Sequence, residues 1–206
     1  MGLHKVNDLS HMSIREDYER IKSARPNMRA RDIARELHIS EAELLCSRIG
    51  QEIIKLEGDW AELIRLMPSL GSVMALTRND SCVHEKHGEY DNISIGPGHG
   101  LVLNKDIDLR LFMSHWHFGF AVSEIVSSGK RHSLQFFDIN GEAVHKVYMP
   151  KGNNLEAYKV IVNKFRSPNQ TEKISFHKLP NGKEDVPDDN LDIENFISHW
   201  SNLKDT

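Results

Sequence analysis

The spacing of apolar residues changes near Gly71, and this change sets the expected fold class. Before Gly71, apolar residues recur at helical intervals in 13–24, 28–37, 40–49 and 60–67, with one short strand at 53–56. After Gly71, they occur in short alternating runs separated by Gly, Asn and Asp, which is typical of antiparallel strands. An amphipathic helix is expected over 155–165. N-terminal helices, an antiparallel meander and a flanking helix predict an α+β fold.

Several local signals refine this expectation. The expected strands are 73–77, 81–84, 92–95, 101–103, 131–137 and 143–149. Asp138-Ile139-Asn140-Gly141 joins the last two as a hairpin turn, because Asn and Gly tolerate positive φ. The stretch 107–126 predicts two strands with a bend about Gly119. Ser40 and Glu43 fit a capping box at a helix start.

Composition divides the chain into four expected segments. Residues 1–11 predict a flexible tail, and residues 12–166 predict one α+β unit. Residues 167–190 are rich in Pro, Asn, Lys, Asp and Glu and predict a linker. In residues 191–206, one helix face is apolar, formed by Ile193, Phe196, Ile197 and Trp200. Because this face has to be buried, the segment is expected to begin a truncated second unit.

The charge balance and the cysteine count argue against several classes of protein. The chain has 30 acidic and 26 basic residues, a net charge of -4, which gives no general attraction to nucleic acid or anionic membrane. No signal-peptide core is evident, and no uncharged apolar run approaches membrane-spanning length. Cys46 and Cys82 form no CxxC motif, so a reducing compartment fits better than a disulfide framework. We therefore expect a soluble cytoplasmic protein without membrane insertion.

The stretch from 108 to 122 carries the clearest chemical pattern. If it is extended, one of its faces presents a cation among aromatic rings, namely Arg110, Phe112, Trp116, Phe118 and Phe120. One interpretation is a strand buried on both faces, with Arg110 in an ion pair at its edge. The other is a flat apolar wall for a planar anionic ligand such as a porphyrin. That ligand needs apolar faces, cations for its propionates and an axial base for its iron.

Histidine is unusually frequent, with 12 residues. His84 lies near an expected strand end that leads into a glycine turn at Gly88. It is either solvated surface or a neutral imidazole that the turn projects from the sheet, free to bind iron. His87 would point to the opposite face of a strand, which argues against a zinc pair.

Residues 28–48 also fit a helix-turn-helix pattern, with Ser40 at the start of a recognition helix. The alternative is a compact helical pair packed on the sheet. The second helix carries Glu41 and Glu43 with a single arginine, Arg48, and these carboxylates would repel DNA phosphates. A DNA-binding regulator therefore stays only as an alternative function. No GxSxG, P-loop or GxGxxG motif is present.

Several blocks in one order resemble the haemin-degrading factor family of bacterial haem-uptake systems, the HemS/ChuS-like proteins. The blocks are 30–34, 40–44, 78–79, 83–85, 108–112, 135–138 and 146–148. The resemblance extends from about Tyr18 to Thr206. It implies the N-terminal half of a duplicated haem-utilisation fold, in which a sheet is flanked by helices. It also implies binding of haem (iron protoporphyrin IX) in the cytoplasm after import, and some members open the porphyrin ring and release iron.

The resemblance also implies roles for particular residues. His84 matches a histidine proposed as the iron ligand in the N-terminal half of some members. Arg110 and Phe112 resemble residues that cover the distal side of haem held mainly by the other half, and Trp116 is a further expected lining residue. The family's principal axial histidine would follow Thr206. The expected function is haem storage, delivery or detoxification, with oxygenase-type ring opening as an alternative. A C-terminal half or a second copy of the chain would complete the site.

Overall fold

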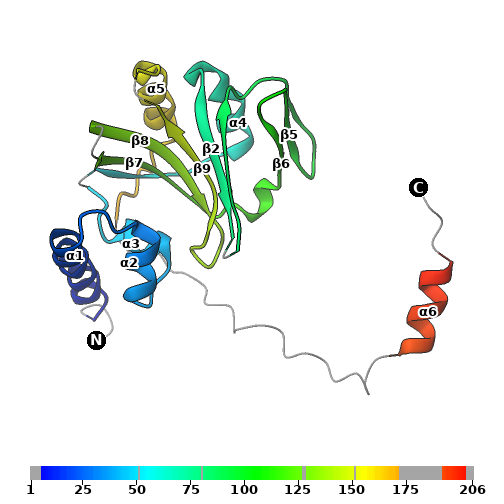
Figure 1. Ribbon diagram of the computed structural model, residues 1–206, viewed down its shortest axis with the longest axis horizontal. Helices are drawn as coiled ribbons and strands as arrows, with labels where there is room; N and C mark the ends of the chain where they lie inside the picture. Colours follow the sequence, from blue (N-terminus) through cyan, green and yellow to red (C-terminus); the bar gives the residue numbers. More distant parts are fainter. Residues whose placement is uncertain are drawn as a thin grey trace.

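The computed structural model describes residues 6–50, 52–79, 81–126, 129–150, 152–171 and 192–202, and it confirms the α+β fold (Figure 1). The helices are α1 (Val6–Ala24), α2 (Ala30–Glu36), α3 (Glu41–Cys46), α4 (Trp60–Leu66), α5 (Leu155–Phe165) and α6 (Ile193–Ser201), with 3-10 turns η1 (Met67–Leu70) and η2 (Met113–His115). The strands are β1 (Ile53–Leu56), β2 (Val73–Arg78), β3 (Val83–Gly88), β4 (Ile93–Ile95), β5 (Gly100–Leu103), β6 (Asp108–Leu111), β7 (Phe118–Val126), β8 (Gly129–Phe137) and β9 (Ala143–Met149).

The strands form two antiparallel sheets. The larger has the order β1-β7-β8-β9-β2-β3, and the smaller has the order β4-β5-β6. The expected turn between β8 and β9 is confirmed, because the Asp138 carboxylate accepts the backbone N–H groups of Asn140 and Glu142, each at 2.9 Å. Gly141 has the positive φ, 81°, that this turn requires.

Helices cover both faces of the larger sheet. Strand alternation sends Leu134, Phe136 and Val147 into a core with α4 and α5. On the opposite face, Phe120 and Phe137 pack against α3. Figure 1 shows α5 on one side of β7, β8 and β9 and α1–α3 on the other. Both layers of the core are therefore organised by the same central strands.

The capping box that starts α3 is confirmed. Ser40 Oγ accepts the Glu43 backbone N–H at 3.1 Å, and a Glu43 carboxylate oxygen accepts the Ser40 N–H at 2.7 Å. The rest of α3 is buried, namely Glu41, Ala42, Leu44, Leu45 and Cys46. This supports the packed helical pair, because a helix buried in this way cannot enter a DNA groove.

The expected bend about Gly119 is wrong. The chain breaks earlier, at η2, and Gly119 lies buried inside β7. A Cβ at Gly119 would lie 2.5 Å from Cη2 of Trp60, whose indole N–H donates to the Trp116 carbonyl at 2.7 Å. Glycine is required here because the Trp60 indole ring approaches the strand closely. A glycine in the sequence does not show whether it allows a bend or a close approach of this kind.

The first and last helices have other bounds than the sequence predicts. Helix α1 begins at Val6, inside the segment expected to be a tail. Most of the expected linker lies outside the described residues. Helix α6 follows an N-cap at Asp192 and has no buried residue, so its apolar face is exposed. Among the described residues, no helix is long and apolar enough to cross a membrane.

A buried histidine lies at the centre of the core. His145 Nε2 lies 2.5 Å from the Tyr90 hydroxyl, and the Trp116 ring stacks on the imidazole with centroids 5.7 Å apart. Burial raises the pKa of Tyr90, so its hydroxyl stays a donor, and burial lowers the pKa of His145 to about 4. His145 Nδ1 has no hydrogen-bond partner, so a protonated imidazole has nothing to compensate it.

This histidine predicts a specific acid sensitivity. The unfolded chain takes up a proton on His145 near pH 6.5, whereas the folded protein does so only near pH 4. Stability is therefore lost as the pH falls through this window, by up to about 3 kcal/mol. Urea unfolding at several pH values should show a smaller loss for His145→Gln than for wild type. Equal pH dependence in the two proteins would contradict this role.

Candidate functional site

The candidate site begins at the junction of β3 and β6. His84 pairs with Thr77 of β2, and strand alternation directs His84 and Lys86 to the same side. A small hollow on that side is lined by His84, Lys86 and Thr77 together with Asp108 and Leu109 of the smaller sheet. The structure thus brings the exposed His84 to β6, the strand that carries Arg110.

A glycine and an asparagine hold these two strands together. A Cβ at Gly88 would lie 2.9 Å from the Asp106 Cβ and 3.0 Å from Cγ1 of Ile107, so the close packing of β3 on the turn before β6 needs glycine. The Asn104 amide donates to the Glu89 carbonyl at 2.8 Å, and its oxygen accepts the N–H groups of Asp106 and Ile107. These contacts fix the start of β6 against the end of β3.

His84 does not project from a turn as expected. Strand β3 continues to Gly88, so His84 lies within the strand, at the edge of the larger sheet. The reason is that Val83–Gly88 forms a continuous ladder with Val73–Arg78. His87 pairs with Met74 and lies on the opposite face from His84, as the sequence predicts.

Arg110 and Phe112 are exposed beside this junction. An Arg110 guanidinium nitrogen lies 3.3 Å from an Asp108 carboxylate oxygen, and the Arg110 side chain is 64% exposed. Such an exposed ion pair contributes little, about 0–1 kcal/mol, so Arg110 can exchange Asp108 for another anion. Phe112 is 54% exposed, and its ring centroid lies 6.2 Å from that of His99. Sequence reasoning missed His99, which follows a Gly-Pro-Gly loop without periodicity.

The expected aromatic wall is not continuous. Trp116 is only 4% exposed and stacks on Phe136 with centroids 4.4 Å apart, so it belongs to the core rather than to a surface with Phe112. Phe120 is fully buried on the α3 side. The break at η2 explains the difference, because it destroys the strand alternation that would align these rings.

The geometry limits the chemistry of the site. The hollow beside His84 has a volume of about 10 Å³, about the size of one water molecule, so it cannot enclose a large ligand. Within the described residues, no group of three His, Cys, Asp or Glu side chains could hold a metal ion. A metal at His84 would therefore bring its other ligands with it, as iron does in a porphyrin. The exposed guanidinium and phenyl ring suit a flat, anionic partner lying on an open surface.

Comparison with known proteins matches the chain to a family. Residues 38–165 match the family described as the haemin-degrading HemS.ChuX domain. Hemin transport protein HemS of Yersinia enterocolitica is 40% identical over 154 residues, which are 74% of this chain and 45% of that protein.

The fold is also similar to those of solved haem proteins. Holo-PhuS, a heme-binding protein from Pseudomonas aeruginosa, superposes with a TM-score of 0.83 at 36% identity, covering 95% of this chain and 57% of that one. The heme degrading enzyme ChuS of Escherichia coli O157:H7 gives 0.80 at 28% identity, covering 95% and 56%. The chain spans about half the length of these relatives.

Proposed function

Because this chain belongs to the haemin-degrading HemS/ChuX domain family, we propose that it binds haem, with the His84 imidazole as the axial ligand of the iron. The observation that carries the proposal is the exposed His84 on the edge strand β3, which shares a small hollow with Asp108 and Leu109 of β6. The same strand β6 carries Arg110. An exposed imidazole can bind iron at the surface of the protein.

Arg110 and Phe112 supply the other features that haem needs. In the proposed complex, the guanidinium exchanges its exposed Asp108 partner for a propionate or donates hydrogen bonds on the distal side. Phe112 packs against the apolar macrocycle. Such binding serves cytoplasmic storage, delivery or detoxification of haem within a bacterial iron-utilisation system.

A second surface would complete this site. The small hollow leaves most of a bound porphyrin in solvent, and the chain covers only 45% of HemS. We propose that residues 12–166 form a half-domain, that 167–190 link it to a second unit beginning at 191–206, and that such a unit or a second copy covers the haem. The exposed apolar face of α6 supports this. Sedimentation that stays monomeric with and without haemin would exclude pairing of two copies.

A haemin titration followed by Soret absorbance tests the binding proposal. We expect saturable binding to the wild type and at least about tenfold weaker binding, or about 1.4 kcal/mol, for His84→Ala. Arg110→Ala should weaken binding by a smaller factor, because ion pairs of an exposed guanidinium contribute little. The matched control is His87→Ala, which removes an exposed histidine from the opposite face of the same strand. Equal affinities for the His84 and His87 variants would overturn the assignment.

The structural likeness to the heme degrading enzyme ChuS favours ring opening as a second candidate. The protein would supply the axial imidazole, and an external donor would supply electrons. Incubation with ascorbate in air should then bleach the Soret band of the wild-type complex. A stable spectrum would leave binding alone as the function.

A further inference from the structure

A larger cleft lies on the other face of the sheet from His84. It is bounded by α2 and the turn after it, by the end of β2 and by the turn between β8 and β9, and its polar lining includes Arg31, Arg35, His38, Arg78 and Asn79. The cleft has a volume of about 900 Å³. Pockets for small molecules have volumes of about 300–1,000 Å³, so the space suits such a ligand.

Cations outnumber anions along this cleft. Arg31 and Arg35 are four residues apart on α2 and therefore lie on the same side of the helix. Arg78 contributes a third guanidinium from the end of β2, whereas the carboxylates of the lining are those of Glu41 and Glu142. This local excess of positive charge stands out in a chain whose net charge is -4.

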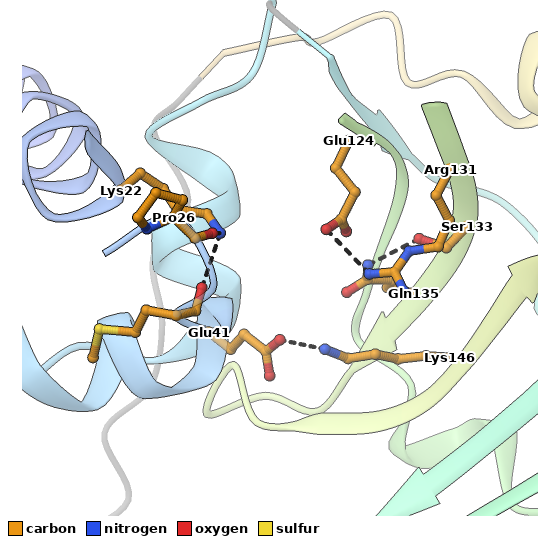
Figure 2. A network of polar contacts seen from close by, with 9 residues as sticks. Lys22, Pro26, Glu41, Glu124, Arg131, Ser133, Gln135 and Lys146 are labelled. Carbon is orange, nitrogen blue, oxygen red and sulfur yellow. Dashed lines mark hydrogen bonds and ion pairs between the residues drawn. The ribbon is translucent and has the colours of Figure 1, made fainter. Parts of the chain in front are cut away.

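The carboxylate of Glu41 is shared between two cations. One of its oxygens accepts from Arg78 at 2.8 Å. The other accepts from Lys146 of β9, as Figure 2 shows. The exposed fractions of the Glu41, Arg78 and Lys146 side chains are 7%, 13% and 4%. The Glu41 carboxylate is therefore already paired with two cations, so it adds no unpaired negative charge to the cleft.

We infer that this cleft binds a small organic anion with several phosphate or carboxylate groups, recognised by Arg31, Arg35 and Arg78. Guanidinium groups bind both kinds of oxyanion through paired hydrogen bonds. The exposed side chains of His38 and Asn79 add hydrogen-bonding groups at the rim.

The anion site is separate from the proposed haem surface. Thr77 and His84 face β6, and Arg78, the next residue along β2, faces α2 and α3 instead. A haem and an anion could therefore bind at the same time, on opposite faces of the β2–β3 hairpin.

Calorimetric titration with pyrophosphate and, separately, with citrate tests this inference. At constant ionic strength we expect saturable binding of at least one probe, and the stronger probe identifies phosphate or carboxylate as the preferred group. Arg31→Gln and Arg35→Gln should each weaken binding about tenfold. The matched control is Arg29→Gln, which removes an exposed arginine just before α2 that does not line the cleft.

Three results would overturn the inference. The first is that neither probe binds saturably to the wild type. The second is that Arg29→Gln weakens binding as much as Arg35→Gln, which would indicate non-specific charge attraction. The third is that a short DNA duplex binds and loses affinity with Arg35→Gln while neither small probe binds, which would assign these arginines to nucleic acid. Urea unfolding of each variant checks that the fold is retained.

Discussion

Replacement of Glu41 by glutamine is expected to lower the free energy of unfolding by about 3–5 kcal/mol, because it leaves two buried cations without their carboxylate. Glu41 accepts from Arg78. It also accepts from Lys146 and so connects α3 to β9 (Figure 2). Burial lowers the pKa of Lys146, and the Glu41 carboxylate opposes this shift. Without the Glu41 carboxylate, the pKa of Lys146 falls further. The variant should therefore regain stability as the pH is raised and Lys146 loses its proton.

An exposed ion pair provides the control for this prediction. Glu62 and Lys164 lie 2.7 Å apart between α4 and α5, with about half of each side chain exposed. Glu62→Gln should cost less than about 1 kcal/mol. Lys146→Met combined with Glu41→Gln should recover part of the loss, because the buried lysine is removed. If Glu41→Gln and Glu62→Gln cost the same, the buried network does not stabilise the fold as described.

Replacement of Gly119 by alanine is expected to cost about 3 kcal/mol or more, the upper range for overpacking a core. Its Cβ would lie 2.5 Å and 2.9 Å from two atoms of the Trp60 indole. The ring cannot easily move, because it packs on Phe136 with centroids 5.4 Å apart and donates to the Trp116 carbonyl. Either β7 shifts or the indole loses these contacts.

Chemical denaturation with two further variants isolates this clash. Gly98→Ala should be nearly neutral, because a Cβ there has nothing within 4 Å. Trp60→Leu makes room for the alanine, so the double variant Gly119→Ala/Trp60→Leu should lose less than the sum of the two single changes. Strictly additive losses would mean that the indole does not cause the effect of Gly119→Ala.

Local signals made much of the fold predictable. The alternation in β8 and β9, the Asn-Gly turn and the Ser40–Glu43 capping box each depend on residues close in sequence. The role of Gly119 depends on Trp60, more than fifty residues away, whose indole N–H also donates to the Trp116 carbonyl just after η2. No spacing rule reports such contacts. For the same reason, the expected wall of Phe112, Trp116 and Phe120 is wrong.

The candidate site was predictable only in its parts. Sequence and resemblance identify His84, Arg110 and Phe112, which the structure leaves exposed. The packing of β3 on the turn before β6 follows from the small size of Gly88 and the Asn104 hydrogen bonds, which appear only in three dimensions. The cleft of Arg31 and Arg78 likewise joins residues from α2 and β2 that no motif connects.

The central claim is that His84 is the axial ligand of haem iron, and exchange of the ligand tests it most directly. Electron paramagnetic resonance of the ferric haem complex should change from imidazole to thioether ligation in His84→Met, whereas His87→Met should keep the wild-type spectrum. Methionine is preferred to cysteine because the exposed Cys82 lies two residues away and already offers a thiol. A wild-type spectrum from His84→Met would contradict the claim and place the iron ligand elsewhere.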